Sequence, residues 1–379
     1  MTNNNGPLSG LRVVDFTWAA MGPYAGYLLA GLGAEVIQVS RPLKGSSSTT
    51  ASITQLFDVG KTVVQIDAKV IEGRQILLDL IEKSDIFLEN FRPGVVESLG
   101  LDFESLSKIN PKLIMVSGSA LGRGGSDSSY VGYAPIFSAL SGLADSTGFE
   151  DGRPTEIRYP ADITSGAVMA FAAIAGAADR QESGTYVDLA ARDALLWTLS
   201  SSFIVNPANK PVKRYGNSHD TSFPHGVFKC SGHDQWVSIS VDHESKRQAI
   251  YSLIGRTDIT ELALMSDPNK QSVEHALNSW TSQFEVKKVV VQLQAIGVAA
   301  FASVDSKDIW EDKHLRARDV FRHVDDIGWV AAPPWRRVGQ QEKLPTTCKS
   351  ASARKRVFNE ILGIELDVIE EMLARGVIG

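Results

Sequence analysis

The first third of the chain alternates short apolar runs with segments of helical spacing. The apolar runs, rich in Val and Ile, cover residues 12–16, 35–39, 62–66, 85–89 and 112–117, and helical spacing is found over 23–31, 73–83 and 95–109. Short β-rich runs separated by helices are typical of a parallel sheet covered by helices. The sequence therefore predicts an α/β fold. Ligands on such sheets bind beyond the carboxyl ends of the strands, which directs attention to residues 17–23, 40–43 and 90–94.

The chain has 379 residues, a length for which two domains are expected. Residues 1–199 are predicted to form the N-terminal part of a large domain, and residues 200–224, which lose all periodicity, a linker. Alternating runs at 226–230 and 235–240 predict a hairpin, and helical spacing follows at 244–254 and 272–293, so residues 225–332 are predicted to form a smaller α+β domain. Residues 333–347 are irregular again, and 352–377 are predicted to be helical.

Charge and cysteine content narrow the range of partners. The formal net charge of −6 disfavours a nucleic-acid or anionic-membrane surface. Cys230 and Cys348 belong to no CxxC pair, so neither a disulfide framework nor a metal site is expected, and a reducing cytoplasm is predicted. The first residues lack the pattern of a signal peptide, and the longest apolar stretch, around 167–178, is expected to be too short to span a bilayer.

Asp162 stands out as a candidate catalytic residue. It lies between Pro160 and an apolar helix of small residues predicted over 167–178. An Asp in this position is often an N-cap whose side chain accepts a backbone N–H. The same N-terminal position also favours an ionised carboxylate, which is the form that nucleophilic catalysis on an acyl group requires. Local sequence leaves both interpretations open.

Other familiar motifs occur only as fragments. Gly60-Lys61-Thr62 resembles the end of a phosphate-binding loop, but Gln55 stands where its first glycine is required. The first predicted strand is not followed by GxGxxG, which disfavours a nicotinamide cofactor. HExxH and GxSxG are also absent, so neither a zinc protease nor a serine hydrolase is indicated. The run Gly122–Gly125 is either a flexible turn or an active-site lid.

A set of segments in one order along the chain carries a more specific resemblance. The segments are PLSGLRVVDFT (7–17), MGP (21–23), LGAEVIQV (32–39), ENFRPG (89–94), LGL (99–101) and YPADITSG (159–166). Together they closely resemble the family III CoA-transferases, the group that contains formyl-CoA and L-carnitine CoA-transferases. The resemblance is strongest over residues 7 to about 190 and continues more weakly to the C-terminal tail.

This resemblance implies a fold, a mechanism and an assembly. Members are interlocked homodimers in which a Rossmann-like large domain, a small α+β domain and a C-terminal return to the large domain follow one another. Asp162 matches the catalytic aspartate, which attacks the donor thioester to form an aspartyl acyl anhydride and then carries CoA as a thioester until a carboxylic acid accepts it. Coenzyme A enters as acyl-CoA substrate, and no permanently bound cofactor or metal is implied.

The resemblance also assigns site residues. The CoA-binding positions of the family match Ala19, Ala20, Met21, Arg41 near the adenine, Ile66, Lys69, Asn90 and Phe91. Three positions depart from formyl-CoA transferase: its CoA-contacting lysine and arginine are matched by Val131 and Ser98, and a glutamate by Ala134, so oxalate or formate is not the expected substrate. Aromatic residues Trp18, Tyr133 and Phe137 are predicted to line a substrate pocket that is more apolar than a site for a small dianion.

Two alternative functions stay open at the level of sequence. An α-methylacyl-CoA racemase of the same fold needs two acid/base groups. Racemases carry Gly-His-Asp where this chain has Gly132-Tyr133-Ala134, and tyrosine with a pKa near 10 is a poor base. A non-catalytic acyl-CoA-binding protein could keep the same fold, but the retention of Asp162 speaks against it. The favoured prediction is a CoA-transferase of unknown acid acceptor.

Overall fold

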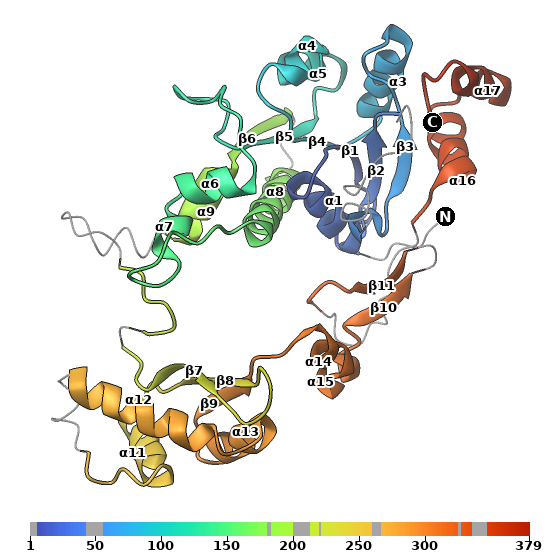
Figure 1. The fold of residues 1–379 in the computed structure, drawn as a ribbon. Coiled ribbons are helices and arrows are strands. Elements are labelled where there is room, and N and C mark those ends of the chain that lie inside the picture. Colours follow the sequence, from blue (N-terminus) through green and yellow to red (C-terminus); the bar gives the residue numbers. More distant parts are fainter. Residues whose placement is uncertain are drawn as a thin grey trace. The chain divides into compact units, whose positions relative to one another are not determined.

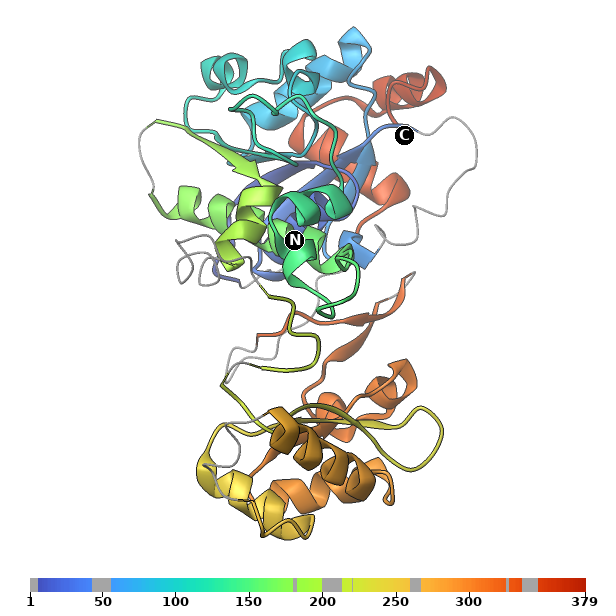
Figure 2. The ribbon, with the colours of Figure 1, turned by 60° about the vertical axis from the view of Figure 1, so that its left-hand side comes forward.

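The computed structural model describes residues 6–42, 56–179, 183–199, 213–219, 221–259, 267–324, 327–335 and 347–379. The chain divides into two compact units (Figures 1 and 2). The first comprises residues 1–145, 155–212 and 317–379, and the second comprises 146–154 and 213–316. The predicted boundaries at 200, 225 and 333 stay predictions, and each unit is described by itself.

A six-stranded parallel sheet forms the centre of the first unit. Its order is β3-β2-β1-β4-β5-β6. The strands are β1 (Arg12–Phe16), β2 (Glu35–Ser40), β3 (Thr62–Gln65), β4 (Ile86–Glu89), β5 (Ile114–Ser119) and β6 (Thr185–Ala190). The predicted α/β class with a parallel sheet is confirmed, and the sixth strand was not predicted. This order reverses between β1 and β4, which is the switch point where doubly wound sheets bind their ligands.

Alternating side chains of the strands face two separate cores. Val13 packs with α1 (Met21–Gly31) and α8 (Tyr159–Asp179), whereas Val14 packs with α3 (Ile71–Glu82). Because successive strand residues point to opposite faces, helices cover both sides of the sheet. The remaining elements of this unit are η1 (Leu56–Asp58), α4 (Val95–Ser98), α5 (Phe103–Ile109), α6 (Ala134–Leu140), α7 (Leu143–Ser146), α9 (Ala191–Thr198), β10 (Phe321–Val324) and β11 (Gly328–Ala331).

The C-terminal segment packs beside the first strands although it is far away in sequence. Cys348 bridges to Thr62, the first residue of β3, and Ile378 bridges to Ile66, which follows β3. The segment consists of α16 (Ser350–Arg354), a π-helical turn (Lys355–Ile361) and α17 (Leu366–Ala374). Its buried Val357 joins the core beneath α3.

Several predicted helices are interrupted. The stretch 95–109 is divided into α4 and α5 at Gly100, whose φ is +67°, and 352–377 is divided at Gly363, whose φ is +77°. Only glycine adopts such angles without strain, so these residues end the helices. The stretch predicted as one helix over 272–293 is two, α12 (Asp267–Thr281) and α13 (Val286–Ala295).

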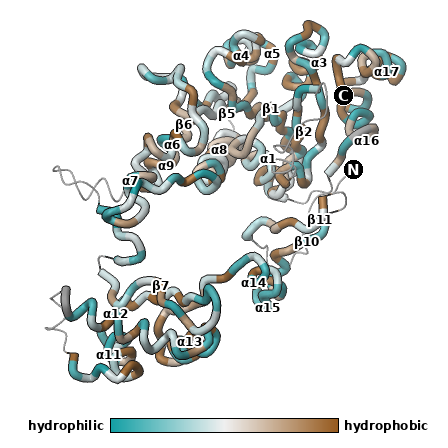
Figure 3. The backbone as a smooth tube through the Cα atoms, viewed as in Figure 1, coloured by the Kyte–Doolittle hydropathy of each residue, from teal (hydrophilic) through white to brown (hydrophobic). Residues whose placement is uncertain are grey.

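Helix α8 is longer than predicted and contains Asp162 within its first turn. It begins at Tyr159 and runs for 21 residues, and an 18-residue window within it has a mean hydropathy of 1.5, so the expectation that no apolar stretch reaches membrane-spanning length is wrong. Figure 3 shows pale to brown colours over most of this helix. Its buried residues, including Met169, Ala170 and Ala173, pack in the core together with α1, as expected of a central helix in a folded domain.

The second unit is built on a three-stranded antiparallel sheet. Strands β7 (His225–Lys229) and β8 (Trp236–Ser240) form the predicted hairpin, and β9 (Ala299–Ala302) pairs with β8. The helices are α11 (Glu244–Leu253), α12, α13, α14 (Ser306–Glu311) and α15 (Lys313–Ala317). Alternate strand residues such as Val237 and Ile239 pack against α11 to α13.

Candidate active site

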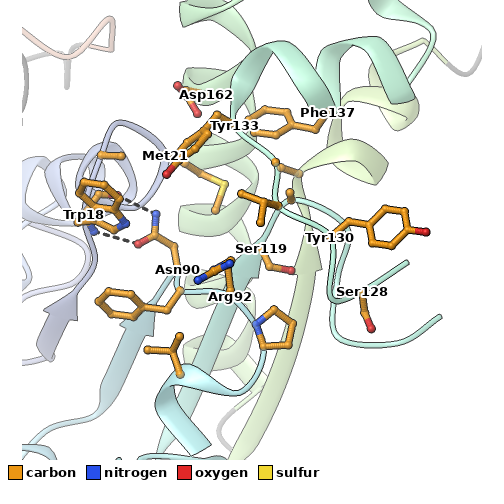
Figure 4. Close-up of a pocket in the computed structure, with 18 residues that line it drawn as sticks. Trp18, Met21, Asn90, Arg92, Ser119, Ser128, Tyr130, Tyr133, Phe137 and Asp162 are labelled. Atoms are coloured by element: carbon orange, nitrogen blue, oxygen red, sulfur yellow. Dashed lines mark hydrogen bonds between the residues drawn. The ribbon is translucent and has the colours of Figure 1, made fainter. Parts of the chain in front are cut away.

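A cavity of about 480 Å³ opens at the carboxyl ends of β1, β4 and β5. The loops after these three strands supply most of its wall, and residues of α1, α4, α6, α8 and α9 supply the rest (Figure 4). The lining residues are Trp18, Ala19, Met21, Asn90, Phe91, Arg92, Pro93, Val95, Ser119, Ala120, Ser128, Tyr130, Val131, Gly132, Tyr133, Phe137, Asp162 and Ala191. The cavity thus lies at the switch point of the sheet, where its topology predicts a ligand site.

A close approach of two helices holds Asp162 at this cavity. One turn after Asp162, Gly166 faces the start of α1, and a Cβ atom there would overlap the backbone of Met21. Glycine is required for backbones to come this close. Gly118, on β5, makes a similar close approach to the side chain of Met21. These glycines let Met21 sit between α8 and β5, and Figure 4 shows Asp162 beside Met21, Tyr133 and Phe137.

Burial raises the pKa of Asp162 to about 6. Local sequence left two interpretations of Asp162 open, an N-cap and a carboxylate kept ionised by the helix N-terminus, and the structure corrects the reasoning behind both. Helix α8 begins three residues before Asp162, so its side chain is not the N-cap, and desolvation alone determines the direction of the shift. The group is therefore mostly ionised at pH 7 to 8 but poorly solvated, a condition that suits a nucleophile.

Two loops are joined by the side chain of Asn90. Its Oδ1 accepts from the backbone N–H of Trp18 at 2.9 Å, and its Nδ2 donates to the carbonyl of Trp18 at 2.8 Å. The next residue, Ala19, has a φ of +63°, a left-handed conformation that is strained for any residue with a Cβ. Strained backbone persists only where its surroundings hold it, and Asn90 supplies two of the bonds that do so.

A buried ion pair supports the first loop from below. The Nζ of Lys61 lies 2.7 Å from Asp15 Oδ2 and also donates to the carbonyl of Pro23 at 2.8 Å, and both charged side chains are fully buried. Thr17 in turn donates to Asp15. Lys61, the lysine of the Gly-Lys-Thr fragment, is therefore buried in an ion pair and is not available to bind a phosphate. This agrees with the rejection of a phosphate-binding loop.

A second ionic cluster ties the walls of the cavity together. Arg123 Nη2 donates to Glu89 Oε1 at 2.5 Å, its Nη1 donates to Glu97, and its backbone N–H donates to Asp188 Oδ2 at 2.8 Å. Glu89 Oε2 accepts from the backbone N–H of Phe91 at 2.9 Å. Burial raises the pKa of Glu89, and the Arg123 guanidinium opposes that rise. Arg123 lies within the run Gly122–Gly125, for which the sequence left a flexible turn and a lid open, and these contacts anchor the start of that run.

Eight of the predicted site residues line the cavity: Asp162, Trp18, Ala19, Met21, Asn90, Phe91, Tyr133 and Phe137. Ala20 is buried behind them. The other three lie away from this cavity, around Asp67. Arg41 is 3.8 Å from its Oδ2, the backbone N–H of Lys69 donates to its Oδ1 at 3.1 Å, and Ile66 keeps its side chain in the core. Ile66 can therefore meet a ligand only through its backbone.

Sequence reasoning missed several lining residues, among them Arg92 and Ser119. Arg92 is the only cationic side chain among the lining residues, and Asp162 is the only carboxylate. Among the described residues no ion pair is formed by Arg92, whose neighbours Phe91 and Pro93 line the same wall. The quoted ENFRPG segment gave a signal, since an arginine between Phe and Pro at a strand end is placed to meet an anion.

The cavity offers a single strong acid/base group. Tyr133 is 59% exposed at the start of α6, and Ala134 behind it is 4% exposed and carries no functional group. A racemase needs a partner for Asp162 on the opposite face of the substrate, and no second carboxylate or histidine is among the lining residues. One carboxylate in a half-open cavity suits acyl transfer.

Comparisons with known proteins agree with this chemistry. Residues 8–347 match the family described as CoA-transferase family III. The chain is 32% identical to the acetyl-CoA:oxalate CoA-transferase of Acetobacter aceti over 67% of its own length and 68% of that protein. It is 27% identical to the succinyl-CoA:mesaconate CoA-transferase of Haloarcula marismortui over 94% of each.

Solved structures give the same result for the fold. A CAIB/BAIF family protein from Brucella suis superposes with a TM-score of 0.83 at 25% sequence identity, over 94% of this chain and 100% of that one. The family match extends over both compact units and includes the cavity and Asp162. This chain belongs to CoA-transferase family III and is an enzyme that moves CoA from an acyl-CoA to a carboxylic acid.

Proposed function

We propose that Asp162 is the covalent nucleophile of the transfer. Its carboxylate oxygen attacks the thioester carbonyl of the donor, the C–S bond breaks, and CoA thiolate leaves behind an aspartyl acyl anhydride. The thiolate then attacks the aspartyl carbonyl, which releases the donor acid and forms an aspartyl-CoA thioester. The acceptor carboxylate attacks this thioester, and the displaced thiolate takes the acceptor acyl group from the resulting anhydride, so that free Asp162 is regenerated.

The observation that carries this mechanism is the isolation of Asp162. It is the only carboxylate among the lining residues, and burial raises its pKa to about 6. A poorly solvated carboxylate is a better nucleophile than a fully hydrated one, and it still loses its proton near neutral pH. The thioester exchange needs no net proton transfer, so the absence of a second acid/base among the lining residues is no obstacle.

The CoA moiety is proposed to run from Asp162 along the loops after β1 and β4. Ala19, Ala20 and Met21 would offer backbone groups, and Asn90 and Phe91 would form the opposite side. Arg41 and Lys69, which gather around Asp67, would meet the phosphates or adenine at the far end. Guanidinium and ammonium groups are the usual partners of phosphates, and neither side chain is buried.

A dicarboxylic acid is the proposed acceptor. The two relatives described above are named for oxalate and mesaconate, both of which carry two carboxylates. Arg92 is placed on the cavity wall to bind the carboxylate that does not react, since it is the only cation there. The aromatic wall of Trp18, Tyr133 and Phe137 favours an acid with a carbon chain between its two charged ends.

We also propose a cytoplasmic homodimer. Large apolar side chains are exposed on three neighbouring helices: Ile136 and Leu140 on α6, Phe171 on α8, and Leu196 and Trp197 on α9. Contiguous exposed apolar surface marks an interaction site. A second copy of this chain, interlocked with the first as the family resemblance implies, would cover it.

A transfer screen tests the proposed acceptor. The protein is incubated with succinyl-CoA or acetyl-CoA and with matched pairs of monocarboxylic and dicarboxylic acids, and new thioesters are measured by mass spectrometry. Dicarboxylic acids are expected to react preferentially, and Arg92→Gln is expected to remove that preference. Equal rates with both classes of acid in the wild type would exclude a dicarboxylate-specific site.

The proposed homodimer is tested separately. The molar mass of the wild type, measured by size-exclusion chromatography with light scattering, should correspond to a dimer.

A further inference from the structure

Ser119 lines the cavity and carries a buried hydroxyl whose hydrogen-bonding capacity is unused. It is the last residue of β5 and is 8% exposed, and its hydroxyl has no hydrogen-bond partner among the described residues. It lines the same cavity as Asp162, and Figure 4 shows its hydroxyl among the side chains that surround the open space. An unpartnered buried hydroxyl destabilises a fold, so such groups are rare and call for an explanation.

The position of Ser119 narrows what it can meet. Its strand neighbour Gly118 lies against Met21, the same residue that packs beside the helix of Asp162. Ala120 follows Ser119 in sequence, and Ala191 follows Ala190, the strand partner of Ser119; the side chains of both lining alanines are methyl groups. One hydroxyl can donate one hydrogen bond, so it suits a single carbonyl or carboxylate oxygen, whereas a phosphate would need several donors.

Ser138 provides a comparison within the same chain. It lies in α6 and is fully buried, and its hydroxyl also lacks a partner among the described residues. Ser138 does not line the cavity, whereas Phe137 beside it does. The two serines therefore share a buried hydroxyl and the lack of a partner, and they differ in whether the residue lines the cavity.

We propose that the Ser119 hydroxyl donates a hydrogen bond to a carbonyl or carboxylate oxygen of the acid that reacts with Asp162. This inference rests on the proposed function, since it assumes an acyl group bound in front of Asp162. The oxygen comes either from the donor acyl group or from the acceptor acid. In both cases an oxygen of the bound acid satisfies the hydroxyl. A site that hydrogen bonds a ligand oxygen binds ligands without that oxygen less well.

The test compares Ser119→Ala with Ser138→Ala in transfer kinetics and thermal unfolding. Both substitutions remove an unpartnered hydroxyl, so both variants are expected to unfold at or above the wild-type temperature. Ser119→Ala alone is expected to lower kcat/KM by about ten- to hundredfold. A higher KM for the donor with an unchanged KM for the acceptor assigns the bond to the donor acyl oxygen, and the reverse assigns it to the acceptor carboxylate.

Equal kinetics of Ser119→Ala and Ser138→Ala would overturn the proposal while the transfer itself stands. A wild type without transferase activity would instead contradict the proposed function, and acyl-CoA binding measured by calorimetry would then decide about Ser119. Weaker binding by Ser119→Ala than by Ser138→Ala supports its contact with the acid, and equal binding refutes it. If an Ala variant does not fold, the nearly isosteric pair Ser119→Cys and Ser138→Cys is compared by the same criteria.

Discussion

The side chain of Asn90 hydrogen bonds both backbone groups of Trp18, at 2.9 and 2.8 Å. These two bonds connect the loops that follow β1 and β4, the strands on either side of the switch point. Asn90 was expected from sequence to contact CoA. Much of the bonding capacity of its amide is used to hold the loop in which Ala19 adopts its positive φ, so Asn90 shapes the site in addition to facing it.

Replacing Asn90 should therefore disturb the first loop. Asn90→Ala removes two hydrogen bonds, each with a net value of about 1 kcal/mol, and frees Trp18 and Ala19 to relax. We expect kcat/KM to fall by about tenfold or more with a moderate loss of thermal stability. Asn90→Asp is the matched variant, because it retains the acceptor for the Trp18 N–H but sets an oxygen against the Trp18 carbonyl. Wild-type activity in both variants would show that the loop does not depend on Asn90.

The activity should lose its nucleophile below about pH 6. Burial raises the pKa of Asp162 to about 6, and only the ionised carboxylate attacks a thioester. In the free enzyme, kcat/KM is expected to decrease roughly tenfold per pH unit below that value. The measurement is a pH profile of kcat/KM with a donor whose own ionisation does not change over this range. A profile that is flat down to pH 5 would contradict the raised pKa of Asp162.

Ionisation of Asp162, which is needed for activity, should lower the free energy of unfolding. A carboxyl whose folded pKa lies above its ordinary value of 3.8 stabilises the fold only when protonated, and this contribution is lost as pH rises through about 6. Asp162→Asn mimics the neutral form at every pH. Its free energy of unfolding should exceed that of the wild type at pH 8, and the difference should shrink as pH falls from about 6 to 4. The free energies of unfolding of both proteins are measured by urea titration at pH 8, 6 and 4.

The Arg123 cluster should control both walls of the cavity. Arg123→Ala leaves Glu89 buried without its ion-pair partner, a change that typically costs about 3–5 kcal/mol. It also releases the loop after β5 from the loop after β4, so the KM for acyl-CoA should rise. Glu97→Gln is the milder control, because Glu97 is 44% exposed and the bond to Glu89 remains. An Arg123→Ala variant with wild-type stability would show that the cluster is not held by this ion pair.

Arg41 should contribute to donor binding and not to the chemical step. Its side chain is 62% exposed, and its ion pair with Asp67 is 3.8 Å long, too long for a hydrogen bond, so the guanidinium can still bind a phosphate. If that contact is made equally in the ground and transition states, Arg41→Ala raises the donor KM about ten- to hundredfold and leaves kcat nearly constant. Arg74→Ala, on the neighbouring helix α3, serves as a control for loss of charge. An unchanged donor KM in Arg41→Ala would assign Arg41 to the solvated surface.

The strands could be predicted closely because they are apolar and short. The sequence-based start of the first strand at Arg12 coincides with the observed one, and the other predicted strands differ by one or two residues. The sixth strand, which begins at Thr185, was missed because its outward-facing residues, such as Tyr186, are polar or exposed at the sheet edge. Helix ends at Gly100 and Gly363 were missed because an isolated glycine inside a helical pattern does not reveal its φ.

Site residues could be predicted where a short local segment is recognisable by its sequence. Asp162 and Asn90 lie in segments of recognisable sequence, and both line the cavity. The ionic cluster of Arg123 was not predictable, since Glu89 lies 34 residues away and only the sheet brings the two together. The raised pKa of Asp162 was also missed, because desolvation depends on packing that local sequence does not specify.

Covalent trapping tests the central role of Asp162 most directly. The wild-type protein is mixed with an acyl-CoA donor, quenched with hydroxylamine and digested, and its peptides are analysed by mass spectrometry beside those of Asp162→Asn. The account predicts that hydroxylamine converts the carboxyl of Asp162 to a hydroxamate only in the presence of donor, and that the Asn variant shows neither this modification nor transfer. Labelling of a different residue, or transfer by the Asn variant at the wild-type rate, would contradict it.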